Sequence, residues 1–211
     1  MTPRILLCSL LAALCLPSAL AQADNPKLVG MVGRNNAFTI SLRDASGALV
    51  THLDPGTYDI EVQDLSEEHN FHLHGPGVNM ATEPETTSDI VWTVTFTDGI
   101  YVFNCDPHAG LMRGWFSVGN VPPNALTGSV GPGRKISVQP KTVQVGPATI
   151  TVTDRSKTDN FHLSGPGVER KTKIAFRGKA TWNVTLQPGR YTYTSDKHKK
   201  LRGSFVVTLP S

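Results

Sequence analysis

The sequence predicts an all-β protein built from two tandem antiparallel sandwiches, and three observations support this. Glycine occurs 19 times and proline 15 times in 211 residues, which indicates many turns. Short runs of alternating apolar and polar residues lie between the turns, and no stretch has a convincing helical period. Hydrophobic residues make up 39% of the chain and charged residues 18%, so wholesale disorder is excluded.

The second sandwich is predicted because the chain repeats itself at an offset of 90 residues. Residues 64–78 read DLSEEHNFHLHGPGV and residues 154–168 read DRSKTDNFHLSGPGV, with ten identities in fifteen positions. Downstream, Trp92 matches Trp182 and Tyr101 matches Tyr191. We therefore predict two copies of one domain. They span residues 24–119 and 134–211, and the Pro- and Gly-rich stretch 120–133 is expected to be a linker.

Within each copy, the alternating runs are expected to be strands. In the first copy these runs cover residues 37–43, 57–65, 69–74, 90–97, 100–105 and 115–118. In the second copy they cover residues 148–154, 160–164, 180–186, 190–195 and 204–208. Short strands with no long helix favour a small sandwich in each copy.

The N-terminus has the pattern of a cleaved signal peptide over residues 1–23. Arg4 supplies the positive charge, residues 5–16 are apolar, and residues 21–23 form a small-x-small cleavage site. A membrane anchor is disfavoured because the apolar run is shorter than the roughly 20 residues that span a bilayer. The mature chain is therefore expected to start at Asp24 and to be periplasmic or secreted.

Export would leave Cys105 as a single cysteine, because Cys8 and Cys15 lie in the leader. Exported thiols are normally oxidised into pairs, so a lone one indicates an intermolecular bridge, a reactive thiol or a metal ligand. The neighbouring residues favour a metal, since Cys105, His108 and Met112 fall within eight residues of a turn-rich segment. A thiolate, two imidazoles and a weak axial thioether form the donor set of blue-copper sites. The second imidazole must come from a distant strand, and His69 is the natural candidate.

The second copy lacks these donors except for His198, which matches His108 and survives without the cysteine, so a histidine at this position can be merely structural. At the matched positions His69 becomes Asp159, His74 becomes Ser164 and Cys105 becomes Ser195, while Met112 falls where the second copy has Leu201 and Arg202. Such a joint loss is expected when a shared metal site has disappeared. The second copy is thus predicted to be a degenerate domain without metal ligands.

The first copy resembles the cupredoxins, the plastocyanin and azurin type of copper protein. The resemblance rests on the pair His69-Asn70 and on the pattern Tyr101-x-Phe103-x-Cys105-x-x-His108-x-x-x-Met112. It implies a Greek-key sandwich and one type 1 copper ion bound by the metal ligands His69, Cys105, His108 and Met112. It further implies that Asn70 stabilises the cysteine loop by hydrogen bonding, and that electrons pass through the exposed edge of His108.

Two further histidines have other expected roles. His72 is matched by His162 in the copy without a cysteine, so we expect a structural hydrogen bond to a neighbouring loop. His74 lies five residues after His69, the spacing at which the similar two-domain nitrite reductases place a ligand for a second copper. Those enzymes also have a histidine beside the copper cysteine, where this chain has Asn104. An exposed strand histidine is therefore the default interpretation of His74.

The two copies carry opposite charge. Residues 24–119 contain 4 Lys/Arg and 13 Asp/Glu, a net of −9, and residues 120–211 contain 15 and 4, a net of +11. The basic copy could dock on an acidic partner or an anionic surface, in which case salt or reversal of Lys197, Lys199 and Lys200 should weaken docking. Ordinary solvated surface charge is the plainer alternative. Export makes nucleic acid an unsuitable target, and no transmembrane segment is expected.

These observations predict a one-electron transfer module rather than an enzyme, with the redox partner unknown. A periplasmic copper storage or delivery protein is the alternative, although exposed, exchangeable Met and His donors would suit that role better. A multicopper oxidase or nitrite reductase would need paired His-x-His motifs or a histidine beside Cys105, and His72-x-His74 is the only such pair.

Overall fold

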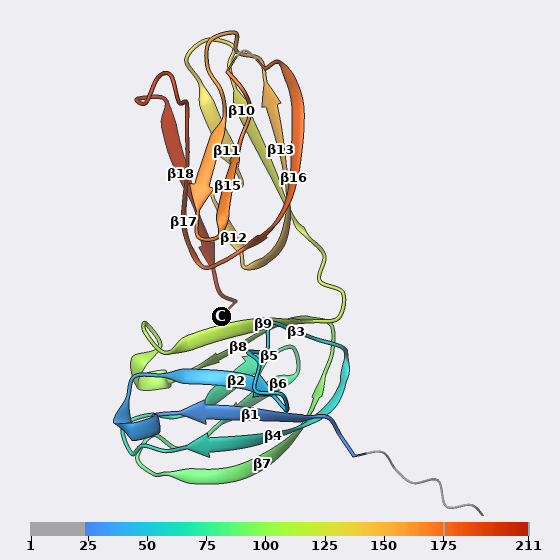
Figure 1. Cartoon of the computed structure of the whole chain (residues 1–211), viewed down its shortest axis with the longest axis vertical. Coiled ribbons are helices and arrows are strands. Elements are labelled where there is room, and N and C mark those ends of the chain that lie inside the picture. The colour runs from blue at the N-terminus through green and yellow to red at the C-terminus, as the bar shows by residue number, and fades with distance from the viewer. Residues whose placement is uncertain (1–23, 175, 211) are drawn as a thin grey trace, which may run out of the picture.

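The computed structural model describes residues 24–174 and 176–210, which form two β-sandwiches, one above the other in Figure 1. In these residues the only helices are two 3-10 turns, η1 (Arg34–Asn36) and η2 (Asp106–His108). The predicted all-β fold class is confirmed. The predicted signal peptide over residues 1–23 lies outside the described residues, within which no helix is long and apolar enough to cross a bilayer.

The N-terminal sandwich consists of a four-stranded and a five-stranded sheet, with strand orders β2-β1-β4-β7 and β3-β9-β8-β5-β6. The strands of the first sheet are β1 (Lys27–Val32), β2 (Ile40–Asp44), β4 (Gly56–Asp64) and β7 (Ser88–Phe96). Those of the second are β3 (His52–Leu53), β5 (His72–Gly75), β6 (Val78–Ala81), β8 (Gly99–Asn104) and β9 (Arg113–Val118).

The C-terminal sandwich repeats this plan, with strand orders β11-β10-β13-β16 and β12-β18-β17-β14-β15. Its first sheet contains β10 (Asn124–Val130), β11 (Ile136–Gln139), β13 (Gly146–Asp154) and β16 (Gly178–Leu186). Its second contains β12 (Thr142–Gln144), β14 (His162–Gly165), β15 (Val168–Lys171), β17 (Gly189–Thr194) and β18 (Arg202–Thr208). Strand for strand, the two sandwiches have the same topology, as the sequence repeat predicts.

The sheets differ from the expected antiparallel arrangement in one respect. β1 runs parallel to β4 and β10 runs parallel to β13, while β2 and β7 complete the first sheet in antiparallel register. The sequence alternation that predicts a strand carries no information about its direction. The sheets are therefore mixed.

The structure also differs from the expected linker over residues 120–133, because β10 lies within it. Leu126, Gly128 and Val130 alternate inward and are buried. Gly128, which suggested a flexible stretch, instead leaves room for the ring of Phe161, since a Cβ there would lie 3.1 Å from that ring. A glycine inside a strand often marks such a close approach.

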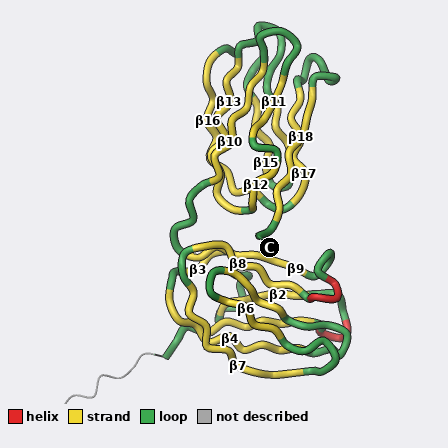
Figure 2. The backbone as a smooth tube through the Cα atoms, turned by 180° about the vertical axis from the view of Figure 1, so that it is seen from behind, coloured by secondary structure: helices red, strands yellow, loops and turns green. Residues whose placement is uncertain are grey.

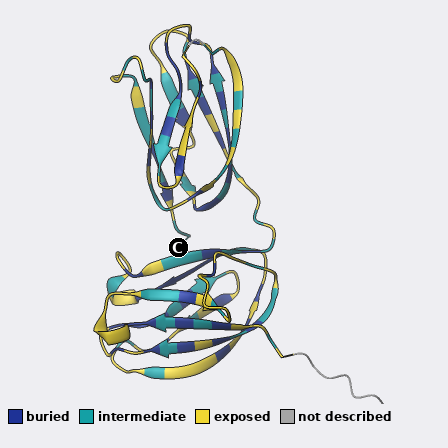
Figure 3. Ribbon diagram, viewed as in Figure 1, coloured by how far each residue is buried: buried dark blue, intermediate teal, exposed yellow. Residues whose placement is uncertain are grey.

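Each sandwich has an aromatic core between its sheets. The buried residues are dark blue in Figure 3. In the N-terminal sandwich Tyr101 and Phe116 are fully buried and stack, with ring centroids 5.5 Å apart. The Tyr101 hydroxyl donates to the carbonyl of Pro76 at 3.0 Å, so its polar end is satisfied. Burial of one such ring stabilises the fold by about 1.5–3 kcal/mol, and these rings fix the strands that carry the site.

The two sandwiches are in contact through the outer face of β8 and β9. Ile100 and Trp115 of the N-terminal sandwich pack against the C-terminal core, and the Trp115 indole donates to Oε1 of Gln187 at 3.1 Å. The loops at the far end of β13 and β17 point away from the N-terminal sandwich (Figure 1).

Candidate metal centre

The candidate site lies at one end of the N-terminal sandwich, the end that carries both 3-10 turns (red in Figure 2). Cys105 follows directly after β8, and His108 is the last residue of η2. His69 lies in the loop between β4 and β5, whereas the sequence placed it inside a strand. The loop position lets its side chain turn toward the end of β8.

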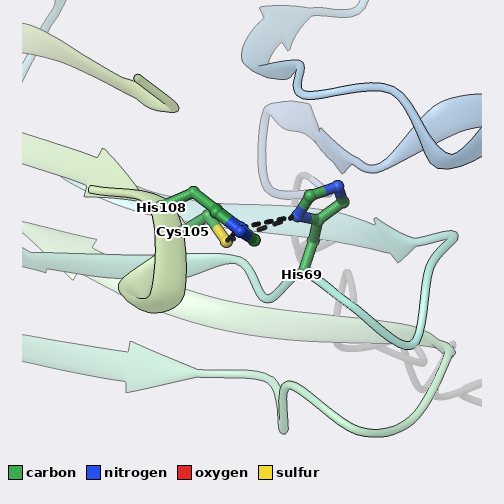
Figure 4. A group of neighbouring side chains, drawn as sticks. All are labelled: His69, Cys105 and His108. Atoms are coloured by element: carbon green, nitrogen blue, oxygen red, sulfur yellow. Dashed lines mark hydrogen bonds between the residues drawn. The ribbon is translucent and has the colours of Figure 1, made fainter. Parts of the chain in front are cut away.

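Figure 4 shows three donor atoms that face one another. Sγ of Cys105 lies 3.7 Å from Nδ1 of His69 and 3.5 Å from Nδ1 of His108, and the two nitrogens are 3.1 Å apart. In the described part of the chain this is the only group of three or more His, Cys, Asp or Glu side chains with the spacing of a metal site.

The size of this triangle fits a metal ion. A triangle with sides of 3.1, 3.5 and 3.7 Å has a circumradius of about 2.0 Å, so one point lies at that distance from all three donors. For zinc, the reference case, metal–nitrogen bonds are about 2.0–2.1 Å and metal–sulfur bonds about 2.3 Å. The triangle would therefore need only a slight displacement of the sulfur to accept an ion.

Burial of the donors supports the same interpretation. Cys105 and His69 have no exposed surface and His108 is half-buried. Nε2 of His69 is buried and has no hydrogen-bond partner among the described residues, so the polar contacts of this ring run through Nδ1 alone. Unpaired buried polar atoms are rare in folded proteins, and a redox or catalytic role is one of the explanations for them.

Met112, the predicted fourth ligand, is fully buried in the same core cluster as Cys105. The loop that carries it is closed by its own backbone. The Cys105 amide donates to the Met112 carbonyl at 3.0 Å, and the Met112 amide donates to the His108 carbonyl at 2.9 Å. These bonds hold the Met112 backbone beside Cys105 and His108, and the axial role of Met112 stays a prediction.

Asn70 ties this loop to the rest of the sandwich, as the resemblance implies. Its Nδ2 donates to Oδ2 of Asp106 at 2.8 Å, and its Oδ1 accepts from the Asp106 amide at 2.7 Å. A third bond from Nδ2 reaches the Thr82 carbonyl at 3.2 Å. The buried side chain of Asn70 therefore holds both the carboxylate and the backbone amide of Asp106, the residue after Cys105.

Asp106 also receives the hydrogen bond expected from His72. Nδ1 of His72 lies 2.7 Å from Oδ1 of Asp106, and its Nε2 lies 2.7 Å from Oδ1 of Asn79. Burial alone would raise the pKa of the Asp106 carboxyl, but hydrogen bonds from Asn70, His72 and Asn104 lower it overall. His162 and Asp196 repeat the contact at 2.8 Å, which supports a structural role for His72.

His74 differs from its expected exposure, because it is half-buried. Its Nε2 lies 3.1 Å from Oδ1 of Asn104, and both side chains line a hollow that Gln144 and Pro210 of the C-terminal sandwich complete. The Asn104 side chain and the ring of His72, whose centroid lies 5.1 Å from that of His74, cover part of the side chain and lower its exposure. Neither His74 nor His72 belongs to a metal-type cluster in the described residues.

Two apolar residues beside the site were not predicted from the sequence. Phe38 is 54% exposed, and its ring meets those of His69 and His108 edge-on at 5.0 and 4.8 Å. Leu111, in the cysteine loop, is 78% exposed. Gly33 permits the approach of the η1 segment that brings in Phe38, because it has a positive φ and a Cβ there would lie 3.0 Å from the His69 ring. No motif at positions 33–38 signals this contact.

The matched position of the C-terminal sandwich holds a hydrogen-bonded cluster instead. Oδ1 of Asp159 lies 2.6 Å from Nδ1 of His198 and accepts from the Ser195 hydroxyl at 2.7 Å. The Ser195 amide donates to the Leu201 carbonyl at 3.0 Å, which identifies Leu201 as the counterpart of Met112. His198 thus has a structural role, as expected from its survival without the cysteine.

Comparison with known proteins gave structural matches only. No family model matches the chain, and no curated protein matches it. Among solved structures, a multicopper oxidase is 13% identical, with 86% of this chain and 88% of that chain covered and a TM-score of 0.31. A reduced amicyanin variant is 22% identical, with 42% of this chain and 87% of that chain covered and a TM-score of 0.31. A copper-containing nitrite reductase from Thermus scotoductus is 14% identical, with 88% and 68% covered and a TM-score of 0.28.

These structures have cupredoxin-like folds, the family that the sequence resembles. Their identities and TM-scores are too low to carry an argument about what this chain binds. Such an argument depends on the donor geometry of the chain itself.

Proposed function

We propose that the protein is an exported one-electron transfer module with one type 1 copper ion at His69, Cys105 and His108, and with Met112 as weak axial ligand. The observation that carries the proposal is the donor triangle, whose three atoms surround a point about 2.0 Å from each. One thiolate and two imidazoles in a trigonal arrangement are typical of blue-copper sites. Bound copper would supply a centre that takes up and releases one electron.

The residues around the triangle support electron transfer because they hold the donors in place. Asn70 and the backbone bonds of the cysteine loop fix Cys105 and His108. Ligands held in this way move little between two oxidation states. Similar outer hydrogen bonds generally orient metal ligands and tune them.

Access to the site also favours an electron carrier over an enzyme or a copper donor. Cys105, His69 and Met112 have no exposed surface, so contact from solvent is made at the half-buried His108. Phe38 and Leu111 give the surface beside His108 an apolar character that suits brief contact with a redox partner. A storage or delivery protein would instead present exposed donors to an acceptor.

Optical titration of the mature chain, residues 24–211, with copper tests the proposal. One equivalent is expected to produce an intense visible absorption from thiolate-to-copper charge transfer, which one electron per copper bleaches reversibly. Cys105→Ser should abolish the colour and weaken copper binding more than about 100-fold, because even outer partners of metal ligands contribute 10–100-fold.

Ser195→Ala is the matched control, because Ser195 occupies the position of Cys105 in the other copy. This variant should leave the colour intact. Colour retained in Cys105→Ser would refute the site. A colourless protein that passes copper to a chelator would indicate storage or delivery, and turnover of nitrite or a phenol would indicate an enzyme.

A further inference from the structure

The end of the C-terminal sandwich that matches the candidate metal end carries a cluster of exposed cations. Four loops lie at this end, because the strands that they connect pair there through their terminal residues. The terminal pairs are Val130 with Asp154, Asp154 with Gly178, and Thr194 with Arg202. It faces away from the N-terminal sandwich (Figure 1). We call it the basic end and define it by exposed cations of three of these loops: Arg155, Lys157, Lys173, Arg177, Lys197 and Lys200.

The carboxylates of this end do not neutralise it. Asp154 and Asp159 are buried, and Asp159 is occupied by His198 and Ser195. Asp196 lies 2.8 Å from His162 and 3.4 Å from Lys199. None of the six defining cations has a carboxylate partner within the described residues, so their charge faces solvent.

The N-terminal sandwich shows that the fold does not require this charge. At the matched positions Lys157 corresponds to Glu67, Lys173 to Glu83, and Lys179 to Asp89. The side chains of these three lysines and of their three acidic counterparts are all exposed. The frame beneath them is the same in both copies, since Asn160 repeats the bonds of Asn70 to the following loops at 3.0 and 3.1 Å. The sign of the surface charge has thus changed while the frame has not.

An apolar side chain accompanies the cations. Ile174 is 51% exposed and lies between Lys173 and Arg177, where the N-terminal copy has Pro84. Long basic side chains can place their charge at a polar boundary while an apolar neighbour enters the hydrocarbon beyond it. Apolar burial combined with attraction to anionic lipids is the basis of peripheral membrane binding.

We propose that the basic end docks on the surface of an anionic lipid bilayer, with Ile174 entering the interface. The cations are spread over loops around an end of the sandwich, which fits a flat layer of mobile headgroups. The N-terminal sandwich, with its net charge of −9 over residues 24–119, is repelled by the same surface and is held away from it. This docking does not depend on what the N-terminal site binds.

Vesicle co-sedimentation of the full mature chain tests the proposal. Binding is expected to vesicles of phosphatidylcholine mixed with phosphatidylglycerol, to be absent with phosphatidylcholine alone, and to weaken as salt is added. The triple variant Lys157→Glu, Lys173→Glu and Arg177→Glu reverses three of the six defining cations. At positions 157 and 173 it installs the glutamate that the N-terminal copy has at Glu67 and Glu83. It should bind at least about 100-fold more weakly, since each cation near an anionic surface contributes about 1 kcal/mol.

The control is the triple variant Lys27→Glu, Arg43→Glu and Arg190→Glu, which changes the net charge equally at exposed positions outside the basic end. It should retain binding, as should Cys105→Ser, while Ile174→Ser should weaken binding about tenfold. Equal loss in both triple variants would overturn the proposal. The proposal would also be overturned if the wild-type chain bound an acidic protein but did not bind anionic vesicles.

Discussion

The matched ends of the two sandwiches share a frame but differ at its centre. In both, a buried asparagine bridges two loops, and a buried threonine binds a buried aspartate, Thr82 with Asp64 at 2.5 Å and Thr172 with Asp154 at 2.9 Å. In one copy the frame surrounds a thiol and two imidazoles, and in the other it surrounds the carboxylate of Asp159. The same frame therefore forms around metal-type donors in one copy and around a carboxylate in the other, and the two ends differ in the side chains at the centre.

The largest expected effect comes from restoring the donors in the C-terminal copy. The variant Asp159→His, Ser195→Cys and Leu201→Met recreates the donor set with the resident His198, and copper stoichiometry should rise from one to two. Calorimetric titration of the apo-protein measures this. A folded variant that still binds one copper would show that the frame, and not only the donors, has changed between the copies.

Asn70→Ala and Asn160→Ala should each destabilise the protein by about 2–3 kcal/mol, because each removes three hydrogen bonds made by a buried side-chain amide. Urea unfolding of the apo-protein measures both. Only Asn70→Ala should also alter the copper spectrum. If it destabilised the protein while the spectrum stayed unchanged, Asn70 would have no role in holding the metal loop.

Asp159→Asn should cost about 1–2 kcal/mol at neutral pH, since hydrogen bonds to a charged group are stronger than neutral ones. Burial raises the pKa of the Asp159 carboxyl, but bonds from His198 and Ser195 outweigh burial and lower the pKa overall. A lowered pKa in the folded state stabilises the protein above the unfolded value of about 3.9. The stability difference should therefore shrink as pH falls below about 4, and a constant difference across this range would contradict the assignment.

Met112→Leu should have the smallest effect, because it gives the N-terminal site the residue that Leu201 provides in the other copy. The change in unfolding free energy should stay below about 1.5 kcal/mol, as for other swaps of similar volume. The blue colour should persist and the reduction potential should rise, since the axial ligand tunes this type of site. Voltammetry measures the potential, and loss of the colour would show that Met112 holds the metal.

The sequence predicted the parts of the fold that depend on local pattern. Alternation located β4, β7, β8 and their counterparts, and the repeat predicted the shared topology. The spacing of Cys105 and His108, with His69 at the matched position of Asp159, predicted the cluster that the structure brings together.

Features that depend on distant contacts could not be predicted. β1 and β10 were missed for two reasons. Their residues match at an offset of 98 rather than 90, as Leu28 and Leu126 show. In addition, Gly30 and Gly128 interrupt the alternation of side chains, because they leave room for the rings of Phe71 and Phe161. The short partners β3, β6, β11, β12 and β15 were missed as well. The approach of Phe38 to the site depends on a turn whose contacts come from another loop.

X-ray absorption of the copper-loaded mature chain tests the central claim most directly, because it reports the atoms bound to the metal. The account predicts one sulfur and two imidazole nitrogens in the inner shell, with the nitrogens at about 2.0 Å. A shell of nitrogen and oxygen only, in a protein with Cys105 intact and reduced, would contradict it.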